Sequence, residues 1–209
     1  PKVKVDGVNK FDSLKNLSKT FKDWEWICVA DNCDENLLSH LKTEYRFDKF
    51  VETQLGNPGS FWKLYELALE FAKDDDIFYF IEDDYLHLPG APEAIEEGLK
   101  YFDYVTLYDH SDKYKLSNTP LNPYAKANRF SESTEIVKGD HQIWRTTNST
   151  TMTFAITGKT LKADADIWSI TKTANKDFDF DNFCVITKQT MLPKSRFLKQ
   201  IPRRLKFWS

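Results

Sequence analysis

Short apolar runs alternate with segments of helical periodicity along the first half of the chain. Apolar residues recur at helical spacing in some segments, whereas others are runs rich in β-branched and aromatic residues, which is typical of strands. We predict helices over 11–21, 35–43, 61–72 and 91–101, and strands over 24–30, 47–53, 77–81 and 104–108. Because helices and strands alternate, we expect an α/β fold with a mostly parallel central sheet flanked by helices.

The pattern becomes less regular after residue 108. Residues 109–147 are rich in Asn, Ser, Lys and Pro, and we interpret them as a long functional loop. A strand over 150–156 and a helix over 159–170 follow, with Gly158 as the turn between them. We therefore expect a single domain over 1–209, with a regular half of about 1–108 and a less regular half of about 109–209.

Three acids, Glu82, Asp83 and Asp84, stand where the 77–81 strand ends. Ligands of open α/β sheets bind beyond the carboxyl ends of the strands. Packing gives no reason for three mutually repelling carboxylates there. Binding of a divalent cation that carries a polyphosphate does give such a reason. Carboxylate oxygens suit Mn²⁺ or Mg²⁺. A second acidic run, 74–76, precedes the strand, and we favour a solvated turn for it.

Two further acids, Asp31 and Asp34, follow the 24–30 strand at the same predicted edge of the sheet. Their carboxylates can accept hydrogen bonds from a base or a ribose, although Asp34 can equally be only the N-cap of the next helix. Residues 56–60 form a turn rich in glycine. This turn can bring backbone amides to a phosphate, and an ordinary turn explains it about as well.

The second half adds two groups of candidates. Residues 177–181 alternate Asp with Phe, so an extended segment would place the acids on one side. One of these acids can serve as a general base, and a polar strand edge is the alternative. His141, Trp144 and Arg145 suit stacking on a sugar and holding an anion, which indicates an acceptor-binding segment. Packing alone would also explain Trp144.

Composition limits the partners. The net charge is −3, which gives no electrostatic case for binding nucleic acid. A basic segment over 194–206 is either a solvated tail, a flap over an anionic ligand or a contact surface. No apolar run approaches ~18 residues, so no membrane span is expected. The three cysteines lack zinc-site spacing, which favours a reduced, cytoplasmic protein. The chain opens on Pro1, and we expect further domains of a longer polypeptide.

Taken together, these motifs resemble the GT-A type of nucleotide-sugar glycosyltransferase. That family has an acid-x-acid motif after a buried strand, and Glu82-Asp83-Asp84 fits it. The resemblance implies that Glu82 and Asp84 bind Mn²⁺ or Mg²⁺, with Asp83 at the donor diphosphate. The Asp31 to Asp34 turn and the loop containing Gly59 resemble the family's nucleotide-sugar contacts.

The resemblance also implies a base and a division of labour. In inverting members, an acid in a late acidic motif is the base, which points to Asp181 or Asp179. Residues 1–108 would then bind the nucleotide sugar and residues 109–209 the acceptor. The segments Glu-Asp-Asp-Tyr-Leu-His-Leu-Pro-Gly and Ser-Thr-Thr-Met-Thr-Phe look closest to transferase domains of chlorella-virus glycosyltransferases. This implies a UDP-sugar donor, a glycan or glycoprotein acceptor, and action in the host cytoplasm.

Three rival functions remain open from the sequence. A nucleotidyltransferase that makes nucleotide sugars should carry an early Gly-rich loop with Arg and Lys, which this sequence lacks. A two-metal phosphoesterase would use the same acids without an acceptor. A carbohydrate-binding module would use the aromatic residues and would not need the carboxylates.

Overall fold

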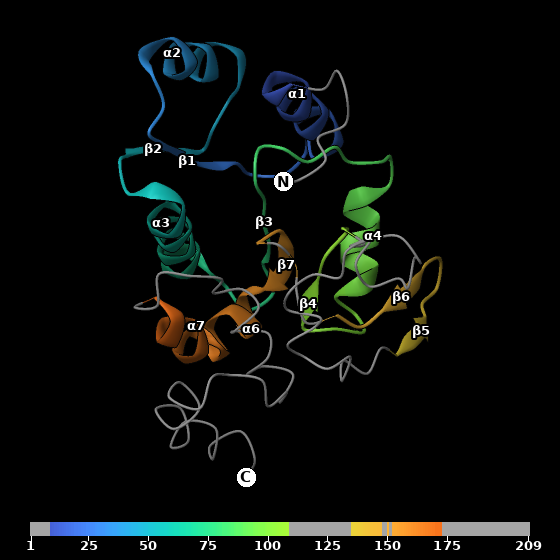
Figure 1. Cartoon of the computed structure of the whole chain (residues 1–209). Coiled ribbons are helices and arrows are strands. Elements are labelled where there is room, and N and C mark those ends of the chain that lie inside the picture. Colours follow the sequence, from blue (N-terminus) through green and yellow to red (C-terminus); the bar gives the residue numbers. More distant parts are fainter. Residues whose placement is uncertain (1–8, 109–134, 148–149, 151, 173–209) are drawn as a thin grey trace, which may run out of the picture. The chain divides into compact units, whose positions relative to one another are not determined.

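The computed structural model describes residues 9–108, 135–147, 150 and 152–172. The chain divides into two compact units. Unit 1 comprises Pro1–Val105 and Ala155–Ala163, and unit 2 comprises Thr106–Phe154 and Asp164–Ser209. The described residues are a mixture of helices and short strands (Figure 1), so the predicted α/β class is confirmed.

The helices and strands alternate in the first half, as the apolar pattern predicted. The helices are α1 (Lys10–Thr20), α2 (Glu35–Glu44), α3 (Gly56–Phe71), α4 (Ala91–Gly98), α6 (Gly158–Ala163) and α7 (Ala165–Thr171). The strands are β1 (Ile27–Asp31), β2 (Lys49–Thr53), β3 (Ile77–Phe80), β4 (Tyr104–Val105), β5 (Ile136–Lys138), β6 (Ile143–Arg145) and β7 (Phe154–Thr157).

The described strands form three small sheets rather than the expected single, mostly parallel central sheet. β1 and β2 are parallel, in register from Ile27 opposite Lys49 to Asp31 opposite Thr53. A second sheet has the order β3-β7-β4, in which β4 and β7 are antiparallel. β5 and β6 form an antiparallel hairpin. Alternation of helices and strands therefore predicted the elements, but it did not fix which strands pair.

The parallel pair of unit 1 is covered on both faces. Figure 1 shows α2 on one face of β1 and β2 and α3 on the other. α3 contributes the largest group of core side chains, namely Phe61, Trp62, Tyr65, Leu67 and Ala68. The Tyr65 ring stacks on Phe80 of β3 at 5.9 Å, and its hydroxyl donates to the Leu161 carbonyl of α6 at 3.1 Å. These contacts join α3, β3 and α6 into one core.

The structure differs from the sequence predictions at several boundaries and in one segment. α3 begins at Gly56, so the expected 56–60 turn is its first helical turn. Pro58 is compatible with this position because the first turn needs no backbone donor there. The predicted 159–170 helix is interrupted at Asp164. The β5–β6 hairpin lies within 109–147, which was expected to be an irregular loop.

The acidic run Asp74–Asp76 forms a turn, as predicted. Gly158 N–H donates to the Asp76 carbonyl at 2.8 Å, and Lys159 N–H donates to the Asp74 carbonyl at 3.0 Å. The Asp74 carboxylate also pairs with Lys162 of α6. A Cβ on Gly158 would lie 1.9 Å from the Lys73 carbonyl oxygen, so only glycine fits there. This run therefore links the turn before β3 to α6.

Within the described segments, no helix is long and apolar enough to cross a membrane.

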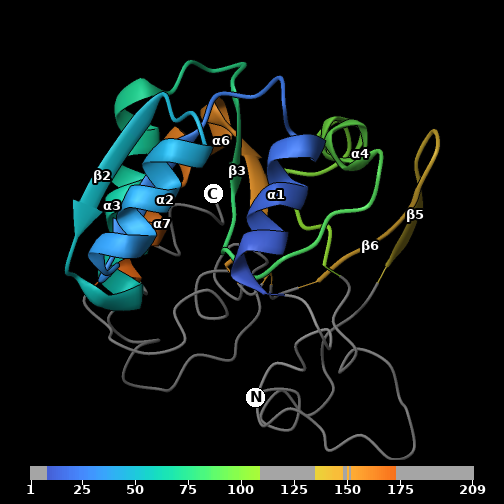
Figure 2. The ribbon, with the colours of Figure 1, turned by 90° about the horizontal axis from the view of Figure 1, so that it is seen from above.

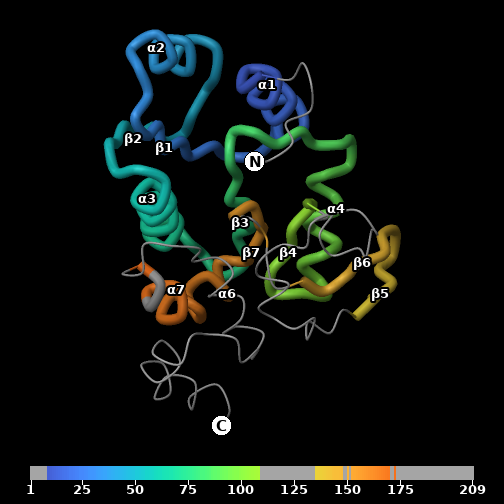
Figure 3. The backbone as a smooth tube through the Cα atoms, in the orientation of Figure 1, coloured from blue at the N-terminus to red at the C-terminus, as the bar shows by residue number. Residues whose placement is uncertain are grey.

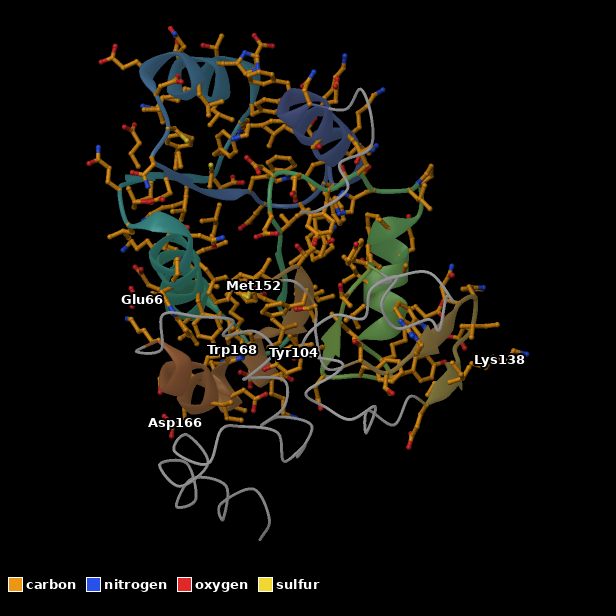
Figure 4. All side chains as sticks on the ribbon, in the orientation of Figure 1. Glu66, Tyr104, Lys138, Met152, Asp166 and Trp168 are labelled. Atoms are coloured by element: carbon orange, nitrogen blue, oxygen red, sulfur yellow. The ribbon has the colours of Figure 1, made fainter. Side chains whose placement is uncertain are left out.

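In unit 2, Trp168 of α7 (Figure 4) is fully buried and stacks on Phe154, with ring centroids 5.2 Å apart.

Candidate functional site

Lys10, at the start of α1, interacts electrostatically with acids that follow β1 and β3. The Asp83 carboxylate forms an ion pair with Lys10 at the start of α1, with 2.9 Å between Oδ2 and Nζ. The pKa of Lys10 is raised, chiefly by its hydrogen bond with Asp83, and the negative charge of Asp34 makes a smaller contribution. Asp83 and Asp34 are far apart in the sequence, and each follows the carboxyl end of its strand, with Asp83 in contact with Lys10.

Asp31, the last residue of β1, is fully engaged by its neighbours. Its Oδ1 accepts hydrogen bonds from the Leu55 N–H at 2.6 Å and the Thr53 hydroxyl at 2.8 Å. Its Oδ2 accepts one from Asn32 Nδ2 at 2.7 Å. These bonds lower the pKa of Asp31, the Leu55 amide most of all, with a further contribution from the Gly56 amide. Asp31 thus binds the end of β1 to the start of α3.

The N-terminus of α3 therefore already has an anion beside it. Asp31 accepts from the Leu55 amide, which precedes the 56–60 segment, and the Gly56 amide of that segment contributes as well. Packing explains why residue 59 is a glycine, because a Cβ there would lie 2.5 Å from the Leu55 Cβ. Asp34 is the N-cap of α2 and accepts from the Leu37 N–H at 2.8 Å. The structural alternative for Asp34 is therefore present, whereas residues 56–60 are helical rather than an ordinary turn.

The Glu82 to Asp84 segment follows β3 in a loop that runs beside α1 (Figure 2; Figure 3). Glu82 is half-buried, and Asp83 and Asp84 are exposed. No group of three or more His, Cys, Asp or Glu side chains is arranged to hold a metal in the part of the chain that the structure describes. Mg²⁺ and related ions, however, are commonly held by one or two carboxylates together with waters and substrate phosphates.

The chemistry of the neighbouring groups fits a hard, oxygen-bound cation. Burial raises the pKa of Cys28 to about 12, and the pKa of Cys33 is also raised, mainly by burial. Without a bound metal, both thiols therefore stay protonated near neutral pH. The available donors are carboxylate oxygens, and these match Mn²⁺ or Mg²⁺.

The loop that carries the acids is fastened three residues further on, at His87. The Asn16 side chain of α1 accepts from the His87 N–H at 2.6 Å and donates to the His87 carbonyl at 3.0 Å. The His87 ring is buried, forms a hydrogen bond between Nε2 and the Tyr79 hydroxyl at 2.9 Å, and packs edge-on against Phe21. Burial lowers the pKa of His87 to about 4. We call these four residues the His87 clamp.

The His87 clamp could not be found from the sequence, because its members come from separate elements. It gives the buried His87 ring a structural role, with Nε2 engaged by the Tyr79 hydroxyl. It also occupies Asn16, which begins an Asn-Leu-Ser glycosylation pattern. A glycan there would be attached to Nδ2, the atom that donates to the His87 carbonyl.

The remaining candidates lie in unit 2 or outside the described residues. Asp179 and Asp181 fall within residues 173–209, which the structure does not describe. Trp144 and Arg145 are on β6, opposite Val137 and Ile136, and His141 is in the turn of the hairpin. Lys138 of β5 points outward (Figure 4). The structure thus places the three predicted acceptor residues on one hairpin.

Comparisons with known proteins do not add to this picture. No protein-family model, curated protein or solved structure matches the chain.

Proposed function

We propose that this chain is a metal-dependent glycosyltransferase with a GT-A-like fold, which moves a hexose or deoxyhexose from a UDP-sugar to a hydroxyl of a glycan or glycoprotein, with inversion. The observation that carries the proposal is the Lys10–Asp83 ion pair, to which Asp34 adds negative charge. Asp83 follows β3 and Asp34 follows β1, and nucleotides bind beyond the carboxyl ends of strands in α/β folds.

The roles divide between the two acidic segments. Glu82 and Asp84 hold Mn²⁺ or Mg²⁺, which supplies Lewis-acid stabilisation of the diphosphate when bound. Asp83 and Asp34 contact the nucleotide sugar. Asp31 and Gly59 support this contact by fixing the end of β1 against the start of α3, since the Asp31 carboxylate is engaged there.

The transfer itself needs a base. The acceptor oxygen attacks the anomeric carbon, its proton passes to a carboxylate, and the sugar–diphosphate bond breaks with its electron pair on the departing nucleoside diphosphate. We assign the base to Asp181 or Asp179, on the resemblance to inverting members of the family. His141, Trp144 and Arg145 would contact the acceptor.

The same resemblance extends the proposal to the setting of the reaction. It favours a viral protein that builds glycans of viral glycoproteins in the host cytoplasm, as one part of a longer polypeptide. Expression of the complete reading frame and fractionation of infected cells would test this setting.

The decisive variant is Asp84→Ala, with Asp75→Ala as its matched control. Both side chains are exposed, and they lie beyond opposite ends of β3. We expect Asp84→Ala to lose sugar transfer and Mn²⁺-dependent donor binding while unfolding like the wild type, whereas Asp75→Ala keeps both activities. Undiminished transfer by Asp84→Ala would sink the assignment.

Calorimetric titration of the wild type with a panel of nucleotide sugars, with and without Mn²⁺, separates the rival functions. A glycosyltransferase should bind a nucleotide sugar only with Mn²⁺ and then turn it over with an acceptor. Binding of free glycans without any need for the carboxylates would instead indicate a carbohydrate-binding module. Release of phosphate without an acceptor would indicate a phosphoesterase, and formation of a nucleotide sugar from a sugar phosphate would indicate a nucleotidyltransferase.

A further inference from the structure

Lys10 lies at the N-terminus of α1, where the helix dipole disfavours a positive charge. It is the first residue of α1, and the positive end of a helix dipole repels a cation there. The helix is already capped without it, because Asn9 accepts from the Phe11 and Asp12 amides and Asp12 accepts from the Asn9 amide. Helix formation therefore gives no reason for a lysine at this position.

The acids of the candidate site do give a reason. The Lys10 ammonium lies 2.9 Å from Asp83 Oδ2 and also feels the negative charge of Asp34. It is therefore a positive charge that pairs with Asp83 and also interacts with Asp34. A lysine placed in this way can neutralise them when nothing is bound.

The Lys10–Asp83 ion pair can be broken without loss of the local structure. The side chains of Lys10 and Asp83 are 46% and 51% exposed, and such surface pairs add little to stability. The loop does not depend on the pair either, because the His87 clamp fastens it to the same helix. Release of Lys10 from Asp83 would therefore leave the loop in place.

We propose that Lys10 is a second cation of the donor site, which holds Asp83 in the empty site and moves onto the diphosphate when the nucleotide sugar binds. The proposal rests on the proposed function and deepens it. A lysine ammonium suits the phosphate oxygens because it donates charge-assisted hydrogen bonds to them. Lys10 and the bound metal together offset the charge of the nucleoside diphosphate, and Asp83 is freed for the metal or the sugar.

The test compares Lys10→Met with Lys42→Met. The Lys42–Glu52 pair is a matched control, because it is also an exposed ion pair of unit 1, with a separation of 2.5 Å and side-chain exposures of 53% and 49%. Mn²⁺ binding is measured alone by the paramagnetic resonance signal of the free ion. UDP binding is then measured by calorimetry at saturating Mn²⁺, and melting temperatures serve as a check on folding.

We expect opposite changes for the two ligands in Lys10→Met. Mn²⁺ alone should bind at least about twofold tighter because a competing positive charge is gone. UDP should bind about tenfold more weakly. Lys10→Arg should keep UDP affinity within about threefold of the wild type. Lys42→Met should leave both affinities unchanged, and all melting temperatures should agree within about 4 °C.

Two results would overturn the role of Lys10, and they are distinguishable. If the wild type binds Mn²⁺ and UDP and Lys10→Met binds UDP equally well, Lys10 is only a surface tether and the proposed function stands. If the wild type binds neither ligand, the proposed function fails and the role of Lys10 fails with it. Should Lys10→Met not fold, Lys10→Gln and Lys10→Arg give the same comparison, since Gln removes the charge and Arg keeps it.

Discussion

Two acidic strand ends of unit 1 are fastened in opposite ways. At the end of β1, the acid itself holds the strand end in place, because the Asp31 carboxylate accepts hydrogen bonds from Leu55, Thr53 and Asn32. At the end of β3, the His87 clamp holds the loop at a point after the acids, and Asp83 forms only an exposed ion pair with Lys10. The fold thus uses one acid for its own stability and leaves the other able to exchange partners, which is what a ligand-binding carboxylate needs.

The largest expected effect comes from breaking the His87 clamp with Asn16→Ala. This change removes the partner of both the N–H and the carbonyl of His87, a buried residue. Each buried backbone group left without a partner costs about 1–3 kcal/mol, so we expect the free energy of unfolding to fall by about 3 kcal/mol. Urea denaturation measures this loss.

Ser18→Ala is the matched control for that variant. It also removes the glycosylation pattern, but the Ser18 hydroxyl only donates to the Lys15 carbonyl on the exposed side of α1. Its unfolding free energy should stay within about 0.5 kcal/mol of the wild type. Equal stabilities for Asn16→Ala and Ser18→Ala would show that the clamp does not hold the loop.

The clamp also predicts a loss of stability in mild acid. The pKa of His87 is lowered from 6.5 to about 4 by burial, so the unfolded chain binds a proton at a higher pH than the folded one. Its contribution is therefore fully present above pH 6.5 and is lost as the pH falls from 6.5 toward 4. We expect a loss of about 2 kcal/mol between pH 7 and pH 5.

Urea denaturation across this pH range, for the wild type and His87→Gln, checks the prediction. The variant should be less stable at pH 7, yet its stability should change much less between pH 7 and pH 5. Asp31 does not interfere, because its pKa is lowered and its contribution is lost only as the pH falls below the ordinary range of an aspartate. A wild-type stability that is flat between pH 7 and pH 5 would contradict a buried neutral His87.

The sequence predicted local features of this unit well. The capping of α2 by Asp34 depends on neighbouring residues only, and it was recognised because an N-cap aspartate precedes a helical pattern. The strand before Glu82 was likewise visible as a run of aromatic and β-branched residues. The predicted strand near Trp24 instead begins at Ile27, since the Trp24 N–H still bonds to the Phe21 carbonyl in the turn after α1.

Features that depend on contacts between distant residues were not predictable in the same way. Asn16 and His87 are brought together only by the packing of α1 against the loop after β3, so no periodicity marks them. The antiparallel pairing of β4 and β7 has the same origin, because alternation of elements does not fix the direction of pairing. The engagement of Asp31 with Leu55 also follows from the parallel register of β1 and β2, which ends with Asp31 opposite Thr53.

The smallest expected effects give the sharpest test of the two strand ends, because the same isosteric change can be made at both. Asp31→Asn removes the charge from an acceptor of three hydrogen bonds, and charged acceptors make stronger bonds than neutral ones. We expect it to lower the free energy of unfolding by about 1 kcal/mol. Asp83→Asn removes one exposed ion pair and should change stability by less than about 0.5 kcal/mol. Mn²⁺-dependent UDP binding should show the reverse order, with Asp83→Asn weakening it more than Asp31→Asn. If Asp83→Asn costs more stability than Asp31→Asn, the acid at β3 is a structural fastener as well, and the contrast between the two ends is wrong.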